Sequence, residues 1–161
     1  MRKAWLAFVP LVLAACTVSV LDPESLEQEN AGAATLALTS GTSFGECLGY
    51  CRTVLLVDSL TLTFTESPYN GVPTPQLPIR TRTLPLSLAD WKRVRGLVDV
   101  AALARLEGVH GCPDCADGGA EWIEIGPSTD RVRVTFEHGA TLAGIGPLQA
   151  ELRALRARFP G

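Results

Sequence analysis

The stretch LTLTFT, residues 60–65, decides the fold class because apolar side chains alternate with threonines along it. Successive side chains of a β-strand point to opposite faces of a sheet, so this alternation predicts a strand with one buried face. The stretch RVRVTF, residues 131–136, repeats the pattern. The apolar positions of the two predicted strands are Leu60, Leu62 and Phe64, and Val132, Val134 and Phe136.

Further segments extend the predicted sheet. Residues 121–125 are expected to pair with residues 131–136 across the turn-forming sequence GPSTD. Residues 53–66 are expected to form either a tight hairpin or one long bent strand. Weaker strand patterns cover residues 34–39 and residues 79–84.

Three segments later in the chain carry helical signals. Ser87 can cap a helix that follows it, with Asp90 three residues on. A short second helix is expected at residues 100–106, and Pro147 opens a third. The third helix has an apolar stripe made of Leu148, Leu152, Leu155 and Phe159. The arginines that we expect mostly off this stripe are Arg153, Arg156 and Arg158.

Together these elements predict an α+β fold, with an antiparallel sheet and helices packed on one face. Residues 34–161 have the size of one domain and enough apolar residues for a core, in which Trp91 and Trp122 are expected. Residues 16–33 are mostly polar and acidic and show no sustained period. We therefore expect them to form a flexible tether before the single domain.

The N-terminus reads MRKAWLAFVPLVLAAC, in which two basic residues precede an apolar run and then Cys16. The run covers residues 4–15, whereas a helix that crosses a bilayer needs about 20 residues. This pattern is typical of a cleaved signal peptide, here residues 1–15. The junction LAAC resembles the lipobox of bacterial lipoproteins, which implies a lipid on the thiol of Cys16 and an acyl chain on its amine.

The lipobox resemblance implies a protein of the bacterial cell envelope, anchored by lipid and facing the periplasm or the cell exterior. Loss of Arg2 and Lys3 with the signal peptide lowers the 14 basic residues to 12 against 17 acidic residues, a net charge of −5. An acidic domain is a poor partner for nucleic acid. The expected partners are therefore the membrane, through the lipid anchor, and another protein of the envelope.

Four cysteines remain when Cys16 is assigned to lipid: Cys47, Cys51, Cys112 and Cys115. An even number of cysteines in an oxidising compartment predicts two disulfides. Local bridges close small loops worth about 2 kcal/mol each in the chain-entropy model, whereas a bridge between the two motifs closes about 60 residues and is worth about 4 kcal/mol. Loop-closure entropy thus favours cross-linked pairings.

The sequence GECLGYC, residues 45–51, resembles the Gly-x-Cys-x-Gly-x-Cys motif of a domain-of-unknown-function family of bacterial envelope proteins, many of them lipoproteins. In this family the motif leads directly into a β-hairpin. The resemblance implies no known activity. It does imply local bridges, Cys47 to Cys51 and Cys112 to Cys115, which is the pairing that we expect.

Two other interpretations of the cysteines remain open. Cys112 and Cys115 form a CxxC pair that could exchange thiols and disulfides, although the residues after Cys115 do not favour a helix and Asp114 would raise a thiol pKa. Alternatively, zinc could bind all four cysteines, with His110 replacing one of them. An oxidising compartment disfavours zinc thiolates, so we expect no metal and no cofactor.

Other motifs are weaker. The sequence GTSFG, residues 41–45, matches a nucleophile elbow around Ser43, but no helical pattern follows it. His110 and His138 have no visible partner for catalysis and are expected at the surface. The proline-rich loop at residues 67–79 is a candidate docking segment. We therefore expect a non-enzymatic binding or structural domain, with redox or metal-binding chemistry at the CPDC motif as the alternative.

Overall fold

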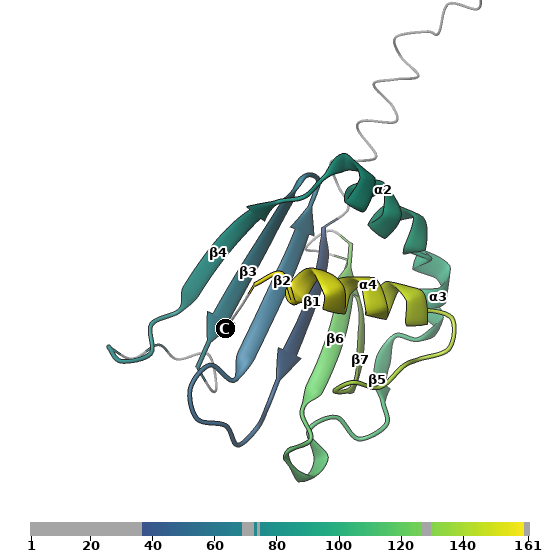
Figure 1. Ribbon diagram of the computed structural model, residues 1–161. Coiled ribbons are helices and arrows are strands. Elements are labelled where there is room, and N and C mark those ends of the chain that lie inside the picture. The colour runs from purple at the N-terminus through teal and green to yellow at the C-terminus, as the bar shows by residue number, and fades with distance from the viewer. Residues whose placement is uncertain (1–36, 69–72, 74, 127–129, 160–161) are drawn as a thin grey trace, which may run out of the picture.

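The structure is a computed structural model that describes residues 37–68, 73, 75–126 and 130–159 (Figure 1). The predicted signal peptide, Cys16 and the predicted tether lie outside the described residues, as do parts of the proline-rich loop. Among the residues that are described, no helix is long and apolar enough to span a membrane.

Seven strands form one sheet within the described residues, in the order β4-β3-β2-β1-β6-β7-β5 (Figure 1). Every neighbouring pair is antiparallel except β5 and β7, which are parallel. The sheet is therefore mixed, although mostly antiparallel. The strands are β1 (Leu38–Ser43), β2 (Arg52–Asp58), β3 (Thr61–Ser67), β4 (Arg80–Pro85), β5 (Gly108–His110), β6 (Ala120–Ile125) and β7 (Val132–Glu137).

The hairpin alternative for residues 53–66 is confirmed. β2 and β3 pair antiparallel from Asp58 opposite Thr61, which leaves a tight turn in which Ser59 has a φ of 47°. Leu60 lies in this turn with 48% of its surface exposed, so its assignment to the buried strand face was wrong. The chain reverses direction at Leu60, so this residue lies in the turn although it continues the alternating pattern of the strand.

Two other strand predictions need correction. β1 begins at Leu38 and runs to Ser43, so it extends beyond the predicted segment at residues 34–39, whose first residues are not described. The short parallel strand β5 was not predicted, because three residues beginning with a glycine give no readable period. The predicted strands at 79–84, 121–125 and 131–136 correspond to β4, β6 and β7.

Three α-helices lie within the described residues: α2 (Leu88–Leu97), α3 (Val100–Arg105) and α4 (Gly146–Arg156). The predicted cap is confirmed, because the Oγ of Ser87 accepts a hydrogen bond from the backbone N–H of Asp90 at 3.1 Å. Asp99 caps α3 in the same way, through the N–H of Ala102 at 2.8 Å. The α+β class is therefore confirmed.

One hydrophobic core joins the three helices to the sheet (Figure 1). The strand residues of this core share one face, as the register shows by placing Leu38 opposite both Val57 and Ile125. We call the face that carries them the inner face, and the opposite face the outer face. The core contains Leu38, Leu55, Val57, Leu62, Phe64, Ile123, Val134 and Phe136 from the strands, Trp91, Val94, Leu103, Leu148, Leu152 and Leu155 from the helices, and Phe159 from the segment after α4.

A buried ion pair interrupts the inner face. The carboxylate of Glu121 on β6 accepts hydrogen bonds from Arg153 and Arg156 of α4, and from the N–H of Gly139 at 3.1 Å. Arg156 also donates to Ser40 of β1. Three arginines were expected mostly off the buried stripe, and Arg156 departs from this expectation because its side chain is only 11% exposed and lies against the sheet.

Candidate functional site

The cysteines lie in two loops at one end of the sheet. The Cα atoms of Cys47 and Cys51 are 5.6 Å apart, and those of Cys112 and Cys115 are 5.4 Å apart. Both separations are ordinary for disulfides, so the structure is compatible with the two local bridges. We call residues 44–51 the first disulfide loop and residues 111–119 the second disulfide loop.

The second disulfide loop is a compact turn without an α-helix. Its only helical element is the three-residue 3₁₀ turn η2 (Cys115–Asp117), within which Ala116 has a φ of 50°. The loop is closed by a hydrogen bond from the N–H of Asp114 to the carbonyl of Gly119 at 3.0 Å. The carboxylate of Glu137 accepts the N–H of Cys112 at 2.8 Å and fixes the loop to β7.

The two disulfide loops contact each other through Asp114. Its Oδ1 accepts a hydrogen bond from the backbone N–H of Gly45 at 2.9 Å. A side chain at residue 45 would collide with this carboxylate, because a Cβ there would lie 2.6 Å from Oδ2. This contact explains the first glycine of the Gly-x-Cys-x-Gly-x-Cys motif. The second, Gly49, has a φ of 102°, which other residues rarely adopt.

An aromatic contact supports the same junction. The ring of Phe44 lies against Gly119, where an added Cβ would approach the ring to 2.4 Å. The rings of Phe44 and His138 form an edge-to-face pair with centroids 4.9 Å apart. His138 is exposed, as expected for a surface residue, and its ring nevertheless contacts that of Phe44. The first disulfide loop thus contacts the second through both polar and apolar groups.

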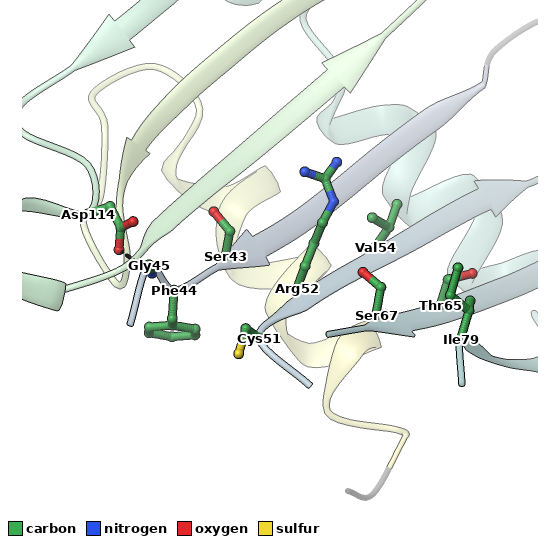
Figure 2. Close-up of a pocket in the computed structure, with 10 residues that line it drawn as sticks. All are labelled: Ser43, Phe44, Gly45, Cys51, Arg52, Val54, Thr65, Ser67, Ile79 and Asp114. Carbon is green, nitrogen blue, oxygen red and sulfur yellow. Dashed lines mark hydrogen bonds between the residues drawn. The ribbon is translucent and has the colours of Figure 1, made fainter. Parts of the chain in front are cut away.

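A groove of about 430 Å³ opens on the outer face beside this junction (Figure 2). Its floor comes from three neighbouring strands, because Arg52 of β2 stands opposite both Ser43 of β1 and Ser67 of β3. Figure 2 shows these three side chains rising from the same side of the sheet. The full lining is Ser43, Phe44, Gly45, Cys51, Arg52, Val54, Thr65, Ser67, Ile79 and Asp114.

Arg52 is held over the ring of Trp122. Its guanidinium carbon lies 4.7 Å from the ring centroid, and that of Arg133 lies 4.6 Å from the same ring. Trp122 is only 3% exposed, yet it lies on the outer face and outside the core with the helices. Trp122 is therefore buried as expected, but on the opposite side of the sheet from the helix-packed core. Gly41 leaves the space for its ring.

The redox interpretation gains little from this geometry. A cavity of about 320 Å³ lies beside Cys112 and Cys115, with Glu137 and His138 also in its lining. A reactive thiol usually sits at the N-terminus of an α-helix, whose dipole lowers the thiol pKa. The three-residue turn at Cys115 supplies no such dipole.

The metal and hydrolase interpretations gain no support either. Within the described residues, no three His, Cys, Asp or Glu side chains are grouped so that they could hold a metal ion. The Nε2 of His110 instead lies 2.7 Å from the carbonyl oxygen of Leu106. Ser43 is the last residue of β1 and leads into the first disulfide loop, so it lacks the helix that a nucleophile elbow requires.

Sequence reasoning missed the groove and its charged residues. The sequence pattern gave no binding role to Arg52, and it connected Asp114 only with the pKa of a neighbouring thiol. No local signal brings these residues together, because the Gly45–Asp114 contact spans 69 positions of sequence. A scan against protein-family models and a search of curated proteins found no match for this chain, so the family resemblance of residues 45–51 stays a prediction.

Proposed function

We propose that this chain is a lipid-anchored protein of the bacterial envelope, whose domain binds a ligand in the groove on the outer face. In this proposal Cys16 carries the lipid, the helices pack only on the inner face, and the outer face remains for binding. The observation that carries the proposal is the groove itself, which both disulfide loops border.

The dimensions and lining of the groove support a binding role. Ligand sites in proteins are concavities of about 300–1,000 Å³ with mostly apolar walls and a few polar groups that orient the ligand. Phe44, Val54 and Ile79 supply apolar wall, while Ser43 and Ser67 supply hydroxyl groups. Two disulfides beside the groove limit the entropy that its walls lose when a ligand binds.

Blocking the groove with a bulky side chain tests the proposal. Thr65 lines the groove, whereas Thr63 lies two residues earlier on the same strand and face but outside the lining. Thr65→Trp should therefore fill the groove, and Thr63→Trp is a matched control. Aromatic residues are well tolerated in strands, so both variants should fold.

The measurement is native mass spectrometry of the anchored protein, extracted from its own membranes in a mild detergent. We expect a bound small molecule on the unaltered protein and on Thr63→Trp, and its loss from Thr65→Trp. A bound molecule that persists in Thr65→Trp would place binding elsewhere. Absence of any bound molecule from the unaltered protein would contradict a ligand-binding role.

A further inference from the structure

Arg52 is an exposed cation fixed at the floor of the groove. Among the described residues it forms no salt bridge, although eight such pairs connect other side chains. Its neighbour over the Trp122 ring, Arg133, does pair with a carboxylate, that of Glu124 at 3.3 Å. One of two arginines over the same ring thus keeps its charge available.

The stack on Trp122 prepares Arg52 to bind. A guanidinium that lies on an aromatic face keeps the N–H groups at its edge free for hydrogen bonds. The buried Trp122 restricts the long arginine side chain, which lowers the entropy lost on binding. The hydroxyl-bearing residues Ser43 and Ser67 stand on either side of Arg52 in the register of the sheet.

The charges of the groove indicate what Arg52 would bind. Arg52 and Asp114 are the two charged residues among those that line it. The Asp114 carboxylate is already oriented by the N–H of Gly45 and repels a second negative charge. One guanidinium without a second cation matches the planar monoanion of a carboxylate better than a phosphate dianion.

We infer that the groove binds an amphipathic carboxylate, whose anionic group pairs with Arg52 and whose apolar part packs on Val54, Phe44 and Ile79. This inference rests on the proposed binding function of the groove and specifies its ligand class. Ser43 and Ser67 would supply further hydrogen bonds to the ligand. Neither disulfide needs to react, because binding involves no covalent step.

Two probes of nearly equal shape test this inference: N-acetyl-leucine, which carries a carboxylate, and N-acetyl-leucinamide, which is uncharged. The methyl signals of Val54 and Ile79 report binding by NMR to the mature anchored protein in lipid nanodiscs. Hydrogen bonds to a charged group are stronger than those to a neutral group. We therefore expect the carboxylate to bind at least about tenfold more tightly than the amide.

Arginine variants identify the group that binds the carboxylate. Arg52→Gln should reduce the affinity for N-acetyl-leucine at least about tenfold and leave the affinity for the amide unchanged. Arg133→Gln removes the second arginine over Trp122 without altering the lining, so it should leave both affinities unchanged. Arg52→Lys should retain part of the preference, because the charge remains.

The outcomes separate this inference from the proposed function. Equal affinities for the two probes, no methyl shift with either, or an unchanged carboxylate affinity in Arg52→Gln would overturn the carboxylate assignment. Tighter binding of a phosphate monoester than of the carboxylate would overturn it too. Thr65→Trp addresses the groove alone, since it should abolish the shifts with both probes.

Discussion

The Oδ1 of Asp114 accepts the backbone N–H of Gly45 at 2.9 Å, and this hydrogen bond joins two loops that each hold one cysteine pair at a separation compatible with a disulfide. Asp114 holds a left-handed backbone conformation with a φ of 63°, and its side chain contacts the first disulfide loop. The sequence CPDC therefore positions the carboxylate of Asp114 for this hydrogen bond. Its acid contributes a structural contact to the wall of the groove.

Loss of the Asp114 side chain should loosen this junction. Asp114→Ala leaves the N–H of Gly45 without its acceptor, which costs about 1–3 kcal/mol when the donor is shielded from water. Asp117→Ala is the matched control, because Asp117 also has a left-handed φ, of 59°. Chemical denaturation and hydrogen exchange at Gly45 measure the effect. Equal losses in the two variants would assign the change to backbone strain alone.

A methyl group at Gly41 should destabilise the sheet. A Cβ there would lie 2.2 Å from the Trp122 ring and 2.5 Å from the carbonyl oxygen of Thr53, so strand and ring must move apart. We expect Gly41→Ala to cost about 1–3 kcal/mol, as other overpacked positions do. Gly96→Ala is the control, because an added Cβ there would meet no neighbouring atom within 4 Å and alanine favours a helix. Thermal unfolding should show a lower Tm for the first variant only.

The buried Glu121 should make stability depend on pH. Burial by itself raises the pKa of this carboxyl, but hydrogen bonds from Arg153, the charge of Arg156 and the N–H of Gly139 outweigh it and hold the pKa below its ordinary value of 4.5. A depressed folded-state pKa stabilises the protein above the unfolded-state pKa, and this contribution is lost as the pH falls through the folded-state pKa.

Glu121→Gln tests this pH dependence. At pH 7 the substitution should cost about 3–5 kcal/mol, because two arginines then lack their buried partner. The difference from the unaltered protein should shrink as the pH falls below 4.5. Urea titrations between pH 7 and pH 3 measure it, with Glu151→Gln at the surface ion pair to Arg93 as control. A difference that does not change with pH would contradict the assignment.

The four cysteines of the two loops should be oxidised in the protein taken from its own envelope. Mass measurement under non-reducing conditions with thiol blocking should show a deficit of about four hydrogens and no stoichiometric metal. Reduction should cost about 2 kcal/mol for each small loop. Four blocked thiols, or one zinc per chain, would promote the metal interpretation instead.

Cys16→Ala should abolish both signal-peptide processing by the lipoprotein peptidase and anchoring in the membrane. The expected product is an uncut chain without lipid, because the thiol of Cys16 is the group that accepts it in the lipobox interpretation. Metabolic labelling with a fatty acid and fractionation of membranes measure the two effects. A lipid-labelled mature protein from this variant would exclude Cys16.

Local patterns predicted most of the elements because burial of one face leaves a regular trace in the sequence. Leu62 and Phe64 on β3, and the Ser87 cap of α2, show this directly. The pattern could not predict partners that meet across long separations. The pair of Glu121 and Arg156 is separated by 35 positions, and each side chain taken alone reads as a surface charge.

The site was less predictable for the same reason. Arg52 and Trp122 are 70 positions apart, and only the order of the strands brings them together over Gly41. The parallel strand β5 was hidden because its three residues are too few for a period. The cysteines were recognisable, since their compartment could be inferred from the N-terminus, but the contact between their loops depends on a backbone conformation at Asp114 that composition does not encode.

β1 is the first described strand after the proposed anchor, and it lies between β2 and β6 with antiparallel pairing on both sides. Its far end runs into Phe44 and Gly45 at the groove. A mechanical load between the membrane and a bound ligand would therefore run along the length of β1 in shear. The hydrogen bonds of β1 to β2 and to β6 would then bear the load together. Such a load would have to break many of these bonds at once, whereas a load at an edge strand breaks them one after another.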